Sequence, residues 1–237
     1  MRVHYSGVRS TQPSVARAGG PVADGTRARL ITAAEQLFAE RGVDGVSLRE
    51  INRASGAKNA VAVQYHFEDR AGVIRAILEK HRPAVEASRH DALDAYEAAP
   101  DDHDLRTLAG ALVRPLAEKL ADTDGGLEYL QIQAELVNRT NVRPTRDGED
   151  RNDSIQRWRA LIGPFLGEDA ERLHRRFTAI RFSSAELGRR AASGRHRDDR
   201  LFISHLVDLV TALLVAPTST ETLALADARD ASRRQRR

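Results

Sequence analysis

Residues 46–67 constrain the fold of this chain more than any other stretch. Ser47 stands three residues before Glu50. This spacing is the capping box, in which each side chain accepts a hydrogen bond from the other residue's backbone N–H at the start of a helix. The pattern predicts a short helix that begins at Leu48. Gly56 can adopt the left-handed backbone conformation that ends such a helix.

A second short helix is predicted from about Asn59 to His66. Two short helices joined by a glycine-containing turn form a helix-turn-helix, a motif whose second helix can enter the major groove of DNA. An ordinary corner between two packed helices has the same pattern. Residues 46–67 alone do not separate the two possibilities.

The rest of the chain also predicts helices. Alanine, leucine, arginine and glutamate dominate, apolar residues recur at helical spacing, and no sustained alternation predicts a strand. We therefore expect an all-α fold. Helices are predicted at residues 26–41 with Thr26 as the cap, at 103–121, 127–139, 154–165, 169–193 and 199–215, and in a long element after Asp69 that Pro83 should kink or divide.

The chain is predicted to contain four regions. Residues 1–23 carry arginines without a nearby acid (Arg2, Arg9, Arg17) and few large apolar side chains. Two interpretations fit this composition: a flexible basic arm that contacts phosphates, or a dispensable leader. The Arg-rich tail, residues 217–237, is expected to be disordered. Between them we expect a helix-turn-helix DNA-binding domain at residues 24–82 and a second helical domain at residues 83–216, to which the family resemblance described below assigns effector binding and dimerisation.

Composition excludes several classes of protein. Apolar residues make up 41% of the chain, which is enough for a core, but no run of about 18 apolar residues predicts a membrane span. The N-terminus lacks a secretory pattern and the chain has no cysteine, so we expect a cytoplasmic location and neither disulfides nor thiolate metal sites. The eight histidines are scattered, and no nucleotide-binding or hydrolase motif is recognisable. No metal, no cofactor and no catalytic residue is therefore expected.

Three blocks of sequence resemble the TetR/AcrR family of bacterial repressors. They are TRARLITAAEQLFAERG, VSLREINRASG and YHFEDRAGVIRAIL, in the family's order and at nearly its spacing, and they cover residues 26–78. The turn at residues 56–59 is one residue longer than the commonest family form. Gln64 rather than Tyr65 therefore stands three residues before Phe67. This difference leaves undecided which side chain contacts which base, but it does not affect the identification of the motif.

The predicted motif presents side chains that can read DNA. Asn59 and Gln64 carry amides that can pair with adenine, and Lys58 can reach guanine or a phosphate. Ala60 and Val61 could contact a thymine methyl group or fill the core instead. Contacts with DNA phosphates are expected from Arg49, Arg70, Tyr65 and His66, and from Ser47 at the start of its helix. The alternative for the two arginines is a solvated surface charge. The alternative for Tyr65 and His66 is packing against neighbouring side chains.

The family resemblance implies a dimer and an effector pocket. The helices predicted at residues 169–193 and 199–215 would pair with their copies and match a palindromic DNA operator. An unknown small-molecule effector would move the long helix that begins near Arg70 and change the spacing of the two recognition helices. The residues expected to line the pocket, each with a place in the core or at the surface as the alternative, are Gln131, Gln133, Glu135, Asn138, Trp158, Phe177 and Arg181.

Two other functions stay open at this stage. One is a helical protein-interaction module with a degenerate DNA-binding motif. The other, less favoured, is a helical enzyme whose catalytic groups are distant in sequence. A repressor should bind duplex DNA with steep salt dependence and prefer a palindromic site, whereas an interaction module should do neither.

Overall fold

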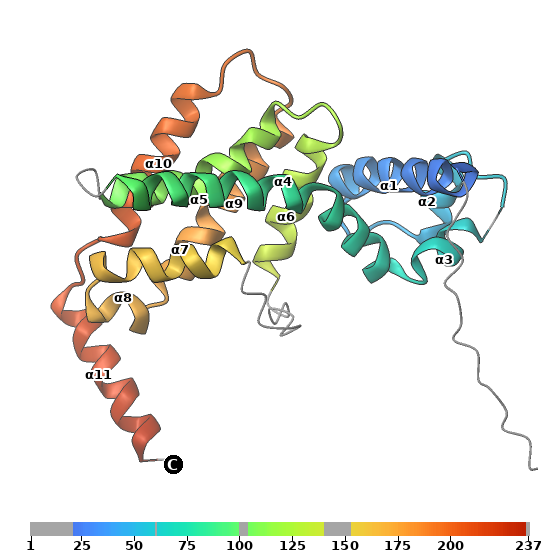
Figure 1. Cartoon of the computed structure of the whole chain (residues 1–237). Helices are drawn as coiled ribbons and strands as arrows, with labels where there is room; N and C mark the ends of the chain where they lie inside the picture. The colour runs from blue at the N-terminus through green and yellow to red at the C-terminus, as the bar shows by residue number, and fades with distance from the viewer. Residues whose placement is uncertain (1–20, 60, 100–103, 140–152, 236–237) are drawn as a thin grey trace, which may run out of the picture.

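The structure is a computed structural model that describes residues 21–59, 61–99, 104–139 and 153–235, and for residues 21–24 it describes the backbone alone. Every regular element in these ranges is helical, so the predicted all-α fold is confirmed. The helices are α1 (Pro21–Arg41), α2 (Leu48–Ala54), α3 (Ala62–Phe67), α4 (Arg70–Ala98), α5 (Leu105–Ala117), η2 (Glu118–Leu120), α6 (Gly126–Asn138), α7 (Ser154–Ile162), η3 (Gly163–Phe165), α8 (Glu168–Arg172), α9 (Arg175–Ala192), α10 (Arg200–Leu214) and α11 (Thr220–Arg234). Helices α1–α3 lie at one end of the molecule, and α4 leads from them into a second, larger body (Figure 1).

Helices α1, α2 and α3 and the first turns of α4 form a small domain around one core. Helix α2 begins at Leu48 as predicted, because Ser47 Oγ accepts from the Glu50 N–H (3.3 Å) and Glu50 Oε2 accepts from the Ser47 N–H (2.8 Å). Gly56 has a φ of +65°, the left-handed conformation expected after this helix. The core side chains, all at most 2% exposed, are Leu30, Phe38, Val46, Ile51, Val63, Val73 and Ile77.

Two predicted boundaries in this domain are wrong. Helix α1 begins at Pro21, so Thr26 lies inside the helix and does not cap it. Helix α3 begins at Ala62 rather than Asn59, because the chain is still turning at Asn59. Its Oδ1 accepts from the Val61 N–H (3.0 Å) and its carbonyl accepts from the Ala62 N–H (3.1 Å). The predicted basic arm falls mostly on residues 1–20, which lie outside the described residues.

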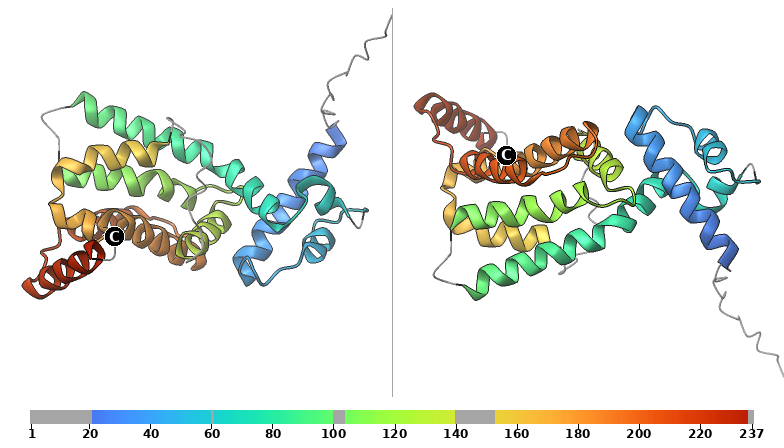
Figure 2. Two further views of the ribbon diagram at one scale, coloured as in Figure 1. Left: turned by 90° about the horizontal axis from the view of Figure 1, so that it is seen from below. Right: turned by 90° about the horizontal axis from the view of Figure 1, so that it is seen from above.

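In the larger body, α5 lies between α4 on one side and the pair α9–α10 on the other (Figure 2). Trp158 on α7 is fully buried, and its indole N–H donates to the carbonyl of Leu108 on α5 (2.8 Å). Helices α6 and α9 approach closely because Gly188 has no side chain: a Cβ there would lie 2.5 Å from the Cβ of Ala134. Pro83 lies within α4, which runs on through it as one helix of 29 residues and is not divided.

In the larger body, the helices predicted at residues 103–121, 127–139, 154–165 and 199–215 are found close to their expected ranges, whereas the region 169–193 and the tail differ. Residues 168–192 form two helices, α8 and α9, because the chain turns at His174, whose φ is +56°. The tail was expected to be disordered but forms α11, which Ser219 caps by accepting from the Thr222 N–H (3.2 Å). Arg172 on α8 holds this helix through Asp227 (2.7 Å) and Asp230 (3.1 Å). These partners are more than 50 residues away in the sequence, so the local pattern did not reveal them.

Candidate nucleic-acid interface

A buried amide joins the two helices of the helix-turn-helix. Asn52 on α2 is 7% exposed. Its Nδ2 donates to the carbonyl of Asn59 in the turn (2.9 Å), and its Oδ1 accepts from the backbone N–H of Val63 in the first turn of α3 (3.4 Å). Val61, at the N-cap position of α3, makes no side-chain cap. Asn52 therefore caps α3 from another helix, a role that sequence reasoning missed because nothing around Asn52 in the sequence indicates its partners.

Helix α3 separates a buried face from an exposed face. Val63 and Phe67 are buried, whereas Gln64 and Tyr65 are exposed, Tyr65 to 80%. His66 is half-buried, with its ring centroid 5.1 Å from that of Tyr65 in an edge-on arrangement. The helix can thus present polar side chains to a partner without disturbing the core that holds it.

The turn before α3 adds further exposed side chains to this surface. Lys58 and Asn59 are exposed, but the Asn59 Oδ1 already accepts from the Val61 N–H, so its amide group is partly engaged. Val61 is 55% exposed, which excludes the alternative that it fills the core. Ala60 lies outside the described residues. The structure therefore brings Lys58, Asn59, Val61, Gln64 and Tyr65 to one end of the molecule.

The start of α2 contributes a second group to the domain surface. Ser47 and Arg49 are exposed there, and the Ser47 hydroxyl donates to Glu50 Oε2 (2.7 Å). Hydrogen bonds from the Ser47 N–H, from its hydroxyl and from the Arg41 guanidinium lower the pKa of Glu50 to about 2. Ser47 can therefore meet a phosphate with its hydroxyl only by giving up part of the capping box, whereas Arg49 extends into solvent without that cost.

Arg70, also predicted to contact phosphate, is engaged within the protein. Its Nη2 donates to the carbonyl of Val46 (2.7 Å), and its Nη1 lies 3.5 Å from Asp44 Oδ1. The side chain stays 37% exposed. In this conformation Arg70 fixes the loop that precedes α2 and offers solvent only part of its guanidinium group.

The seven residues predicted to line an effector pocket do not line one common cavity in the structure. Trp158 belongs to the core, and Glu135 bonds to the N-terminal domain through the N–H of Val43 (3.0 Å). Arg181 lies over the ring of Phe177 (5.7 Å) and donates to Asn138 (3.0 Å) on the exposed side of α6 and α9. The remaining two also lie on α6: Gln131 donates to the carbonyl of Leu127, and Gln133 has a buried Oε1 without a partner among the described residues.

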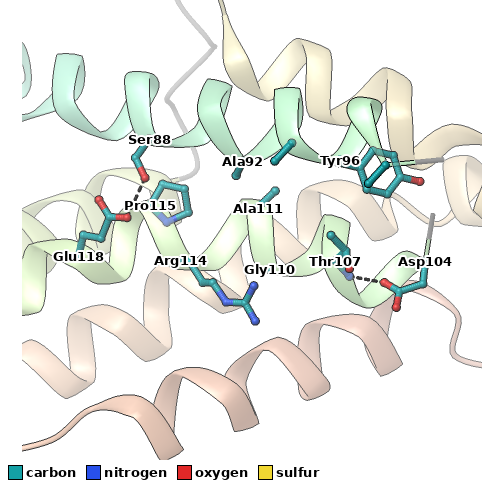
Figure 3. A pocket seen from close by; sticks show the side chains of 12 residues that line it. Ser88, Ala92, Tyr96, Asp104, Thr107, Gly110, Ala111, Arg114, Pro115 and Glu118 are labelled. Atoms are coloured by element: carbon teal, nitrogen blue, oxygen red, sulfur yellow. Dashed lines mark hydrogen bonds between the residues drawn. The ribbon is translucent and has the colours of Figure 1, made fainter. Parts of the chain in front are cut away.

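A groove of about 480 Å³ lies between α4 and α5, and none of those seven side chains lines it (Figure 3). At one end Ser88 donates to Glu118 (2.7 Å), and at the other Asp104 accepts from the Thr107 N–H (2.5 Å). Small residues form most of its lining, which consists of Ser88, Ala92, Ala95, Tyr96, Ala99, Asp104, Thr107, Gly110, Ala111, Arg114, Pro115 and Glu118. Alanine and glycine carry no chemical signal in a sequence, which explains why this groove was not predicted.

Within the part of the chain that the structure describes, no group of three or more histidine, aspartate or glutamate side chains is arranged to hold a metal ion. No helix in the same part is long and apolar enough to cross a membrane.

A helix-turn-helix with an exposed polar second helix is an arrangement suited to binding in the major groove of DNA. Residues 30–77 match the family model for bacterial regulatory proteins of the tetR family. The HTH-type transcriptional repressor BepR of Brucella suis biovar 1 (strain 1330) is 39% identical over 57 residues, a match that covers 24% of this chain and 27% of that repressor. The resemblance predicted from the three sequence blocks is therefore confirmed: the chain carries a TetR-family DNA-binding domain. This chain therefore spans about a quarter of the length of the repressor that it matches.

Proposed function

We propose that the protein is a ligand-responsive transcriptional repressor that binds a palindromic operator as a homodimer. The observation that carries this proposal is the exposed surface of the TetR-family domain, where Lys58 and Gln64 extend into solvent while Val63 and Phe67 lock the helix to its core. Amide and cationic side chains on a helix that fits the major groove are suited to read base edges.

Each side chain on this surface has a specific role in the proposed DNA contact. Gln64 and Asn59 would pair with adenine edges, Lys58 with guanine or a phosphate, and Val61 with a thymine methyl group. Tyr65, His66, Ser47 and Arg49 would hold the DNA backbone, and Arg70 would do so with the part of its guanidinium that is exposed. Phosphate contacts of this kind set the register of the protein on DNA but do not choose the sequence.

Helix α10 supports the proposal of a homodimer. Leu201, His205 and Leu209 are spaced four residues apart and therefore share one face of the helix, and all three are exposed, Leu201 to 84% and Leu209 to 40%. A two-fold axis would bring this face against its own copy and bury it. In this proposal α9 and α10 carry out the pairing that the sequence assigned to residues 169–193 and 199–215. An effector would bind in the helical body, for which the groove between α4 and α5 is a candidate.

The proposal is tested by selecting an operator from random duplex DNA and measuring affinity over a series of salt concentrations. Replacement of both Lys58 and Gln64 by alanine should weaken operator binding by at least about tenfold, because each base contact contributes on the order of 1–3 kcal/mol. Arg233→Ala, which removes one exposed positive charge on α11, outside both proposed interfaces, is the matched control and should leave affinity within about twofold.

Equal affinity of the wild type for selected and random DNA would contradict the repressor and favour a protein-interaction module. The dimer is tested separately by sedimentation of Leu209→Glu. This variant should be monomeric, because it would bury a charge in the proposed interface. An unchanged sedimentation coefficient would show that another surface makes the dimer or that none exists.

A further inference from the structure

Helix α4 buries an arginine in the middle of its apolar face. Val85, Arg89 and Leu93 are spaced four residues apart and share one face of the helix, and each is at most 4% exposed. A charged group inside a protein is costly unless ion pairs and hydrogen bonds satisfy it. Burial accordingly lowers the pKa of Arg89, although the charge of Glu86 opposes this shift. The hydrogen-bond partners of Arg89 therefore have to be identified one by one.

The protein satisfies only one part of the Arg89 guanidinium group. Its Nη1 donates to Ser154 Oγ (2.9 Å) at the start of α7 and lies 3.5 Å from Glu86 Oε1. Among the described residues, no group accepts a hydrogen bond from Nε, which is buried, or from Nη2. A guanidinium carries five N–H donors, and two of its nitrogens together can bind a carboxylate through parallel hydrogen bonds. The structural role of Arg89, which is to hold α7 against α4, leaves the Nε–Nη2 edge unused.

Tyr129 on α6 adds a second unused donor near Arg89. Tyr129 is 3% exposed, and its ring stacks on that of His81 with a centroid distance of 4.6 Å. The hydroxyl group makes no hydrogen bond with the described residues. Burial raises the pKa of Tyr129 to about 12, although the charge of Arg89 opposes the rise. The hydroxyl therefore keeps its proton at neutral pH and can donate it to an acceptor.

Gln133 adds an unused acceptor on the same face of α6. It lies four residues after Tyr129, one helical turn further on, and its buried Oε1 has no partner in the described part of the chain. Helix α4 packs against both α6 and α7, and the charge of Arg89 acts on Tyr129, so this face of α6 lies towards Arg89. A buried polar atom without a partner is destabilising. Several of them in one region indicate that their partner is a molecule from outside the chain.

We propose that the region between α4, α6 and α7 binds a small hydroxycarboxylic acid. The carboxylate of the acid accepts hydrogen bonds from Nε and Nη2 of Arg89 and from the hydroxyl of Tyr129, and the hydroxyl of the acid donates to Gln133 Oε1. None of these three residues lines the groove between α4 and α5, so this is a separate site. The inference rests on the proposed function only in that the acid is the effector of the repressor.

The experiment observes the Nε–H group of Arg89 directly, by NMR of the full chain without DNA. Its signal is assigned through the bonds of the Arg89 side chain, so the assignment requires no variant. The probes are glycolate, β-hydroxybutyrate and p-hydroxybenzoate, in which the hydroxyl lies progressively further from the carboxylate. Each is titrated in a buffer free of other carboxylates, next to its neutral amide and next to the acid without the hydroxyl (acetate, butyrate and benzoate).

At least one hydroxy acid should shift the Arg89 signal in a saturable way, and its amide should bind at least about tenfold more weakly, because the charge-assisted pair of hydrogen bonds is lost. Arg89→Lys should weaken binding to a similar extent, whereas Arg233→Lys, at an exposed arginine on α11, is the matched control and should not.

Two milder variants keep the test decisive if Arg89→Lys does not fold. Tyr129→Phe removes only a hydroxyl that has no partner among the described residues, so it should weaken binding about threefold or more and leave the melting temperature unchanged. Gln133→Leu removes the buried acceptor. It should therefore abolish the preference of the protein for the hydroxy acid over the acid without the hydroxyl.

An Arg89 signal that none of the hydroxy acids shifts would overturn the inference, since the unpartnered atoms would then bind only water. Unchanged affinity in both Tyr129→Phe and Gln133→Leu would overturn it as well. The measurement is independent of the operator. If an acid binds at Arg89 but the wild type prefers no DNA sequence, the site stands and the proposed function fails. If the operator binds and no acid shifts the signal, the site fails and the repressor stands.

Discussion

Asn52 is predicted to determine the stability of the helix-turn-helix. Asn52→Leu keeps nearly the same volume and removes both hydrogen bonds, one to the carbonyl of Asn59 and one from the N–H of Val63. The N–H of Val63 belongs to the first turn of α3, where a helix has no internal acceptor, and Val63 is only 2% exposed. The substitution therefore leaves a buried donor unsatisfied.

The expected loss follows from these bonds. An ordinary hydrogen bond contributes about 1 kcal/mol, and an unsatisfied buried group costs about 1–3 kcal/mol. The bond to Val63 is long at 3.4 Å, so it lies at the weak end of that range. We expect Asn52→Leu to lower the free energy of unfolding of the DNA-binding domain by about 2 kcal/mol. The domain should also lose operator affinity, because α3 is no longer held in one orientation.

Urea denaturation followed by far-UV circular dichroism measures this loss, and hydrogen exchange of the Val63 amide places it in α3. Arg53→Ala is the control for stability, since Arg53 is the exposed neighbour on the same helix. A denaturation midpoint for Asn52→Leu equal to that of Arg53→Ala, with an unchanged exchange rate at Val63, would refute the assignment of Asn52 as the cap of α3.

Three further predictions concern other parts of the molecule. Gly72→Ala should destabilise the DNA-binding domain by about 1–3 kcal/mol, because the new Cβ would lie 1.9 Å from the carbonyl oxygen of Phe67 and push α3 away from α4. Thermal unfolding measures this loss, and an unchanged melting temperature would contradict the described packing. Trp158→Phe should lower the free energy of unfolding by about 2–4 kcal/mol, because it removes a buried hydrogen bond and leaves a cavity. Denaturation followed by circular dichroism measures this loss. A loss below about 0.5 kcal/mol would show that the core collapses around the smaller ring. Hydrogen bonds from Ser47 lower the pKa of Glu50 from 4.5 to about 2. The capping box should therefore stabilise α2 fully above pH 4.5 and lose that effect as the pH falls to about 2. An NMR titration midpoint for Glu50 near 4.5 would refute this prediction.

Local patterns predicted the helix-turn-helix well because its determinants are neighbours in the sequence. The Ser47–Glu50 capping box and the left-handed Gly56 depend on residues within one or two turns of each other, so their spacing in the sequence equals their spacing in space. The start of α3 was predicted too early because Asn59 uses its side chain to extend the turn. Asparagine can do this or enter a helix, and the choice depends on Asn52 in the preceding helix.

The candidate effector site could not be predicted in the same way. Sequence reasoning favoured aromatic and polar side chains on α6, α7 and α9, but the structure puts Trp158 in the core and Glu135 against the DNA-binding domain. Half of the residues that line the groove between α4 and α5 are instead alanine, glycine or proline, and their small side chains leave space only when the two helices are packed together. A cavity is a property of the space between helices and has no counterpart in the periodicity of either one.

The sequence by itself determined the all-α class, the position of the DNA-binding motif and the family of that domain, since each rests on periodicity, capping and ordered motifs read along the chain. Only the tertiary structure decided which charged and amide groups meet: Asn52 with Val63, Glu135 with Val43, and Arg172 with Asp227. It also decided that the tail forms α11, because partners on α8 hold a segment whose own composition is highly polar. Hydrophobic periodicity is a repeating local signal, whereas a single polar contact depends on one distant partner.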